Sequence, residues 1–195
     1  MISIFSKDPD KLLAEATAKK KAGDMDAAIE CLRNAYKEIA KTSINYGVPT
    51  YLRLPLYLQH ANRNDEAWSE FNKLIAEGHP NQMRTRELLP MDHSQIYDKM
   101  RLFLEREKQA RKAVKFGVFS HLSWAQGLYF QGRKDELKHH ISRQSIDDQL
   151  EKLLKKAKRP DKRDNLLEVM MMNIKNFPSI GYAKLGKIID QALAE

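Results

Sequence analysis

Residues 23–29 read Gly-Asp-Met-Asp-Ala-Ala-Ile, and this stretch indicates the fold because altered copies of it return twice. The copies are residues 62–68, Asn-Arg-Asn-Asp-Glu-Ala-Trp, and residues 132–138, Gly-Arg-Lys-Asp-Glu-Leu-Lys. Each copy lies between two segments whose apolar residues have helical spacing. A recurring helix–turn–helix unit predicts a stack of helical hairpins.

The glycine and the aspartate in these turns have separate physical roles. A glycine such as Gly23 permits the backbone conformation that ends a helix, and Asp24 can cap the amino end of the next one. Between the turns, apolar residues recur every three or four positions, and no segment alternates apolar and polar residues as a half-buried strand does. The sequence therefore predicts an all-α protein.

The predicted architecture is an irregular array of helical hairpins over residues 1–144, followed by a cap of three helices over residues 145–195. Pro55 predicts a kink or a late helix start in the second hairpin, because proline removes a helix hydrogen bond. A long helix is predicted from about Ser94 to residue 115, after an irregular segment over residues 79–93. A second helix is predicted over residues 116–131.

The hairpins resemble tetratricopeptide repeats, which favour an apolar-x2-apolar-small-x2-apolar pattern on the first helix and small-x3-aromatic on the second. The second unit gives Tyr51-x2-Leu54-Pro55-x2-Leu58 and Ala67-x3-Phe71, and the third gives His121-x2-Trp124-Ala125-x2-Leu128 and Leu137-x3-Ile141. The first gives Leu12-x2-Glu15-Ala16-x2-Lys19 and Ala28-x3-Leu32, in which Glu15 and Lys19 depart from the pattern. The spacing also departs, because Ala28 and Ala67 are 39 residues apart and Ala67 and Leu137 are 70 apart, against about 34 in the family.

The resemblance implies that the first helix of each hairpin lines a groove that binds a protein or peptide. The groove positions it implies are Leu13, Thr17, Lys20, Leu52, Leu56, Gln59, Leu122, Gln126 and Tyr129. Lys20 is the one basic residue among them, which argues against the carboxylate clamp of chaperone-binding family members. The alternative interpretation is that Leu52, Leu56 and Leu122 belong to the core.

The net charge of +8 is concentrated in one segment of the chain. Residues 101–165 hold 17 Lys/Arg and 9 Asp/Glu, whereas the residues before and after them are balanced. The predicted basic surface comprises Arg101, Lys108, Lys112, Lys115, Lys155, Lys156, Lys158 and Arg159. Such a surface can bind nucleic acid by releasing counterions from phosphates, or an acidic protein, or it can be a solvated surface whose helix-end cations satisfy the helix dipole.

Catalytic and metal-binding motifs are not evident in the sequence. The segment Gly181-x4-Gly186-Lys187 approaches a phosphate-binding loop, but Ile188 follows where Ser or Thr is required. The histidines lack the spacing of a metal site, since His139 and His140 are adjacent and diverge by about 100° on a helix. We expect no metal and no cofactor, and we expect a protein that is not an enzyme. An enzyme or regulatory subunit with an unrecognised site is kept as an alternative, with Arg84, Asp92 and His93 as its candidates.

The cellular setting follows from two further features. Cys31 is the single cysteine of the chain, so no internal disulfide can form and a reducing compartment is indicated. No run approaches the roughly 20 apolar residues of a membrane span. We expect a cytoplasmic, non-membrane adaptor or scaffold whose partner and oligomeric state the sequence does not specify.

Overall fold

The computed structural model describes residues 8–174 and 179–194, and every regular element within those ranges is a helix. The all-α prediction is therefore confirmed. The chain divides into two compact units, residues 1–83 (unit 1) and residues 84–195 (unit 2). The boundary predicted at residue 144 separates a repeat array from a cap, which is a different division from these compact units, and it stays a prediction.

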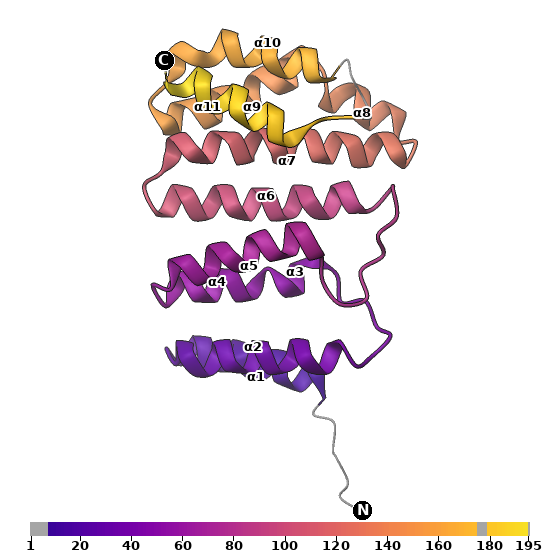
Figure 1. Cartoon of the computed structure of the whole chain (residues 1–195), viewed down its shortest axis with the longest axis vertical. Coiled ribbons are helices and arrows are strands. Elements are labelled where there is room, and N and C mark those ends of the chain that lie inside the picture. The colour runs from indigo at the N-terminus through magenta and orange to yellow at the C-terminus, as the bar shows by residue number, and fades with distance from the viewer. Residues whose placement is uncertain (1–7, 175–178, 195) are drawn as a thin grey trace, which may run out of the picture. The chain divides into compact units, whose positions relative to one another are not determined.

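Unit 1 is built from two pairs of consecutive helices (Figure 1). Its elements are α1 (Pro9–Lys21), α2 (Met25–Ile39), α3 (Val48–Tyr51), α4 (Arg53–His60) and α5 (Asn64–Glu77). Helix α1 packs on α2, α4 packs on α5, and contacts between α2 and α4 join the pairs. The break at Leu52 lets α4 begin at Arg53, so that Pro55 lies in its first turn, where no helix hydrogen bond is lost. This is the late helix start that the sequence offered as one alternative.

One turn geometry ends helices in both units. A left-handed backbone occurs at five of these turns, at Gly23, Asn62, Lys108, Gly132 and Lys158, with φ of 84°, 58°, 58°, 70° and 56°. The Gly23 N–H donates to the Lys20 carbonyl at 3.1 Å and the following N–H donates to the Lys19 carbonyl at 3.0 Å, and the same pair of bonds recurs at the other four. This is the Schellman arrangement, which satisfies two of the last carbonyls of a helix. The next helix then begins two residues after the left-handed residue.

The turn at Lys108 overturns the predicted helices over residues 94–115 and 116–131. Helix α6 (Leu89–Arg106) ends before it, and a single helix, α7 (Ala110–Phe130), follows it. The prediction was wrong because residues 107–109 contain neither Gly nor Pro, so a lysine adopts the left-handed conformation that such residues usually supply. Helix α6 also begins before Ser94, because Pro90 lies in its first turn, where proline is tolerated.

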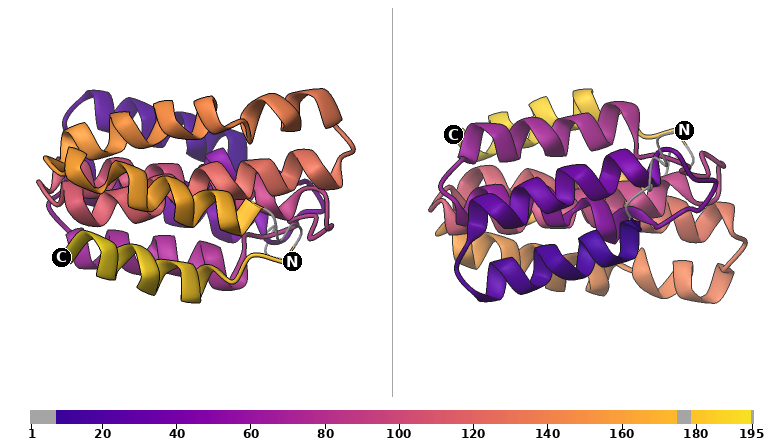
Figure 2. Two further views of the ribbon diagram at one scale, coloured as in Figure 1. Left: turned by 90° about the horizontal axis from the view of Figure 1, so that it is seen from above. Right: turned by 90° about the horizontal axis from the view of Figure 1, so that it is seen from below.

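Unit 2 is organised around α7. After α7 come α8 (Lys134–His140), α9 (Arg143–Ala157), the 3₁₀ turn η1 (Pro160–Lys162), α10 (Arg163–Ile174) and α11 (Tyr182–Ala194). Helix α6 packs along one side of α7, and α9 and α11 pack against another (Figure 1). From above, α8 and α9 follow one another along one side of α7, and α10 lies between α9 and α11 (Figure 2, left).

Three glycines allow these helices to approach closely. A Cβ atom at Gly127 of α7 would lie 2.4 Å from Cγ of Met91 on α6, and one at Gly117 would lie 2.6 Å from Cδ2 of Leu153 on α9. On α11, a Cβ atom at Gly186 would lie 3.1 Å from Cζ of Phe119. At Gly127 and Gly117 a Cβ atom would force the facing side chain to shift, and at Gly186 it would make a tight contact.

The left-handed turn at Lys108 generates a stability prediction. Replacing Lys108 with glycine should raise the free energy of unfolding by about 0.5–1 kcal/mol, because glycine relieves the cost of a positive φ in a residue with a Cβ. The matched control is Lys152→Gly, at an exposed lysine inside α9, where glycine should lower stability by about 1 kcal/mol. Urea unfolding followed by circular dichroism measures both changes. A loss of stability in Lys108→Gly would contradict this account of the turn.

Candidate functional site

An open hollow lies where α7 passes into α8. It has a volume of about 290 Å³ and its walls are mostly carbon. Its lining, which we call the α7/α8 hollow, consists of Leu128, Tyr129, Gly132, Arg133, Lys134, Leu137, Lys138 and Ile141. Leu128 is buried, whereas Tyr129 is 46% exposed. The hollow thus offers apolar surface to a ligand from solution.

Helix α8 turns one selected face toward this hollow. At about 100° per residue, Lys134, Leu137, Lys138 and Ile141 fall within an arc of about 100°. Asp135 and Glu136 lie outside that arc, and Glu136 is held by a salt bridge with Arg133. The lining face of α8 therefore combines aliphatic groups with two lysines, both exposed and neither paired with another described residue.

Two histidines fasten the far end of α8 to α7. The Nε2–H of His121 donates to the backbone carbonyl of His140 at 3.1 Å, and the Nε2–H of His140 donates to the carbonyl of His121 at 3.0 Å. The two rings stack with their centroids 3.9 Å apart. We call this arrangement the histidine clasp. Because α8 contains no buried residue, the clasp is a principal contact holding it in place.

Burial of the clasp favours uncharged rings. Burial, the nearby His140 ring and a partly offsetting hydrogen bond to the His140 carbonyl together lower the pKa of His121 to about 3. Burial also lowers the pKa of His140, with a smaller lowering from His139. A polar pocket of about 460 Å³ adjoins the clasp, and its charged walls include Asp148 and Lys152. Protonation of either stacked ring would place a desolvated charge against its neighbour.

The histidine clasp generates a pH prediction. A folded-state pKa below the unfolded value of about 6.5 means that protons bind the unfolded chain more strongly, so stability is lost as pH falls below about 6.5. For His121 alone, the loss between pH 7.5 and 5.5 should be about 1.4 kcal/mol. His121→Gln should reduce this slope, whereas His139→Gln, at an exposed neighbour, should leave it nearly unchanged. Thermal unfolding at the two pH values measures it, and equal slopes in all three proteins would contradict the assignment.

The groove positions predicted on the first helix of unit 1 meet α4 directly. Arg53 of α4 donates to the Leu13 carbonyl at 2.9 Å and to the Thr17 hydroxyl at 2.8 Å. The Lys20 ammonium lies 4.7 Å from the ring centroid of Tyr57. Arg53 and Tyr57 belong to this cluster but were not predicted, because a sequence pattern does not specify which face of α4 meets α1.

The other predicted groove positions differ in accessibility. Leu52 and Leu122 are 3% and 0% exposed, in accordance with the alternative interpretation that they belong to the core. Gln59 is buried, and the Gln126 side-chain oxygen accepts a hydrogen bond from Tyr182 at 2.6 Å. Leu56 is half-buried. On α7, Tyr129 is therefore the predicted groove residue that a partner can reach.

Unit 1 also contains a pocket of about 280 Å³ between α2 and α5. Tyr51 lies between Tyr36 and His79 in its wall, with ring centroids 4.9 Å and 4.4 Å away. Lys37 and Lys73 line the pocket from the two helices, together with Glu70. Lys37 lies in the last turn of α2, where it also offsets the helix dipole.

The predicted basic surface is divided between paired and exposed residues. Four of its residues form salt bridges. Arg101 pairs with Asp98 and Glu105, and Lys156 also pairs with Glu105. Lys115 pairs with Asp190, and Arg159 pairs with Asp161. Lys108, Lys112, Lys155 and Lys158 are exposed and unpaired with other described residues. Unit 2 holds 23 basic and 15 acidic residues and unit 1 holds 11 of each, so the whole +8 belongs to unit 2.

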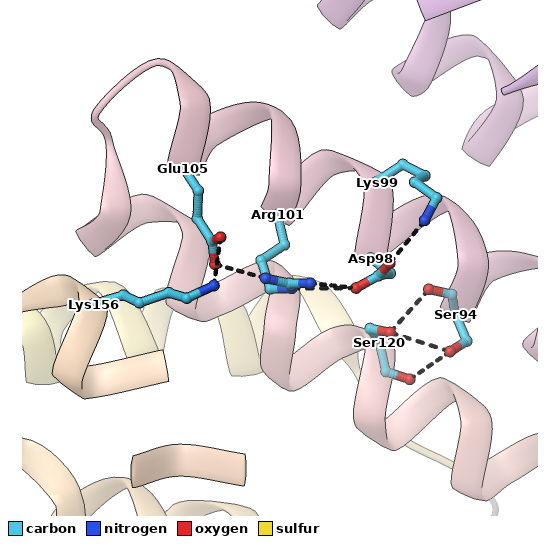
Figure 3. Close-up of polar contacts among 7 residues, drawn as sticks. All are labelled: Ser94, Asp98, Lys99, Arg101, Glu105, Ser120 and Lys156. Atoms are coloured by element: carbon cyan, nitrogen blue, oxygen red, sulfur yellow. Dashed lines mark hydrogen bonds and ion pairs between the residues drawn. The ribbon is translucent and has the colours of Figure 1, made fainter. Parts of the chain in front are cut away.

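Two of these paired residues, Arg101 and Lys156, belong to a row of ion pairs along α6 (Figure 3). Lys99 contacts Asp98, Asp98 contacts Arg101 at 2.7 Å, and Arg101 contacts Glu105 at 2.6 Å. Lys156 reaches Glu105 from α9 at 2.8 Å. Burial opposes ionisation of Glu105, but hydrogen bonds from Lys156 and Arg101 outweigh it and lower its pKa. The row thus connects two helices of unit 2.

A pair of serines supports the same helix. The Ser94 hydroxyl donates to the Ser120 carbonyl at 2.8 Å, and the Ser120 hydroxyl donates to the Ser94 carbonyl at 2.9 Å (Figure 3). These bonds join α6 to α7 by the same reciprocal side-chain-to-carbonyl pairing as in the histidine clasp, but serine does not titrate.

The row generates a second stability prediction. Arg101→Met should lower the free energy of unfolding by about 1–2 kcal/mol, because it leaves two partly buried carboxylates with less compensation. The side chains of Arg101 and Glu105 are each 16% exposed. Lys99→Met removes the more exposed cation at the end of the row, and should cost less than about 0.5 kcal/mol. Urea unfolding at pH 7 compares them, and equal costs would show that the row is not centred on Arg101.

The candidates for an unrecognised enzyme site lie close together. Burial lowers the pKa of His93 most, Asp92 acts to raise it, and Arg84 acts to lower it further. Arg84 is exposed, and Asp92 and His93 are half-buried. Among the described residues, no group of three or more His, Cys, Asp or Glu side chains could hold a metal ion.

Comparisons with other proteins place no relative beside this chain: no family model, curated protein or solved structure matches it. Within the described ranges, no helix is both long enough and apolar enough to cross a membrane.

Proposed function

We propose that this chain is a non-enzymatic adaptor that binds a protein or peptide segment. In this proposal residues 1–144 form a tetratricopeptide-like array, residues 145–195 cap it, and partner binding uses apolar surface between helices. The observation that carries the proposal is the α7/α8 hollow, because a concave apolar surface with an exposed aromatic residue is typical of a peptide-binding surface.

The recurring turns support the array. The left-handed residues Gly23, Asn62 and Gly132 stand at the first position of the three related sequence stretches. Lys108 adds a further helix–turn–helix junction that lacks the sequence signature. A chain built from such junctions presents long helix faces, which recognise extended or helical segments of a partner.

Nucleic-acid binding is the weaker candidate. Four of the eight predicted basic residues are committed to salt bridges within unit 2. Phosphate recognition would have to break those bridges or rely on the four exposed lysines. The apolar hollow, in contrast, is open without rearrangement.

The adaptor proposal predicts which substitutions abolish partner capture. The full-length chain carrying an affinity tag serves as bait in its native cell. Tyr129→Asp and Leu56→Asp each place a charge on a proposed contact surface, so each should remove the captured partner while leaving the helical circular dichroism signal intact. Ile44→Asp is the control, at a large apolar residue that is 57% exposed outside both surfaces. Undiminished capture by both test variants would overturn the proposal.

A further inference from the structure

The chemistry of the α7/α8 hollow specifies the kind of segment that fits it. Its volume of about 290 Å³ suits one or two apolar side chains rather than a folded surface. Its apolar lining comes from the buried Leu128 and the exposed Tyr129 of α7, and from Leu137 and Ile141. Burying an aliphatic or aromatic side chain here contributes about 1.5–3 kcal/mol, which anchors a segment but leaves its specificity to polar neighbours.

The polar neighbours at the hollow are cationic. Lys134 and Lys138 lie one helical turn apart on the lining face of α8, about 6 Å along the axis. Arg133 already pairs with Glu136 and so offers less charge to a ligand. Because Asp135 and Glu136 project from other faces of α8, the lining face itself is positive.

From this geometry we infer that the α7/α8 hollow binds an acidic peptide segment, in which an apolar anchor enters the hollow and flanking Asp or Glu side chains pair with Lys134 and Lys138. Carboxylates about one helical turn apart match the spacing of the two lysines along α8. The location in unit 2, which carries the whole +8, adds long-range attraction for such a segment. This inference rests on the proposed adaptor function and names the chemistry of its partner.

The test uses the full-length chain and three synthetic peptides of six residues. The first carries a central Leu-Phe pair with two glutamates on each side. The second replaces the glutamates with lysines, and the third replaces Leu-Phe with Ala-Ala. Fluorescence anisotropy should show saturable binding of the first peptide, and at least tenfold weaker binding of the other two. Amide shift changes in nitrogen-15 spectra should concentrate in residues 128–141.

Protein variants locate the interaction. The double variant Lys134→Gln, Lys138→Gln should bind the first peptide at least tenfold more weakly than the wild-type chain. Tyr129→Ala should have the same effect. Both variants should retain the helical circular dichroism signal. Lys152→Gln removes an equally exposed lysine from α9 and should leave the affinity within twofold. Raising the salt concentration should reduce the affinity for the first peptide more in the wild-type chain than in the double variant, because salt screens the lysine–glutamate attraction.

Several results would overturn the inference. These are equal binding of the glutamate and lysine peptides, shift changes outside residues 128–141, and the absence of binding at millimolar peptide. Binding of mixed-sequence RNA to these residues in the wild-type chain, lost in the double lysine variant, would also overturn it. If the native partner is captured equally by wild type and the double variant but lost with Tyr129→Asp, the acidic-segment chemistry fails while the adaptor function stands. If the wild-type chain captures no partner, the adaptor function itself fails.

Discussion

Within each unit, the arrangement of consecutive helices depends on how a helix satisfies its last carbonyl groups. An α-helix leaves four carbonyls without intrahelical partners, and burying them unpaired is costly. At Gly23, Asn62, Lys108 and Gly132, two N–H groups beyond the helix donate hydrogen bonds back to two of these carbonyls. The left-handed residue reverses the chain as it does so and starts a new helix two residues later. Helix pairing therefore follows from a local hydrogen-bonding requirement.

This dependence explains how much of the fold the sequence predicts. The all-α class and the turns at Gly23, Asn62 and Gly132 are predictable because glycine and asparagine tolerate positive φ. The turn at Lys108 is not, since its conformation is stabilised by two backbone hydrogen bonds and by the packing of α6 on α7 rather than by the preference of lysine. Pro90 was predicted to lie in an irregular segment, but it lies in the first turn of α6, because proline is tolerated at a helix start as well as in a loop.

The candidate site is less predictable than the fold. The resemblance implies Tyr129 as a groove position, but the α7/α8 hollow also depends on the position of α8 relative to α7. The histidine clasp joins residues 19 positions apart, and adjacent histidines on a helix give no sign that one of them will reach across. Likewise, Lys156 pairs with Glu105 at a separation of 51 residues. Charge counts along the chain therefore locate an excess of cations but not those that remain exposed.

The three glycine contacts have a consequence for how the sequence can change over time. Apolar residues in the core can exchange for one another at modest cost when volume is kept, so most core positions tolerate several residue types. Gly127 has no smaller substitute, and every single-nucleotide change that alters it adds at least a Cβ atom facing Met91. Gly117 has the same limit against Leu153. A substitution at either site therefore requires the side chain opposite to move or to be replaced by a smaller one, so its cost depends on which residue stands opposite when it arises.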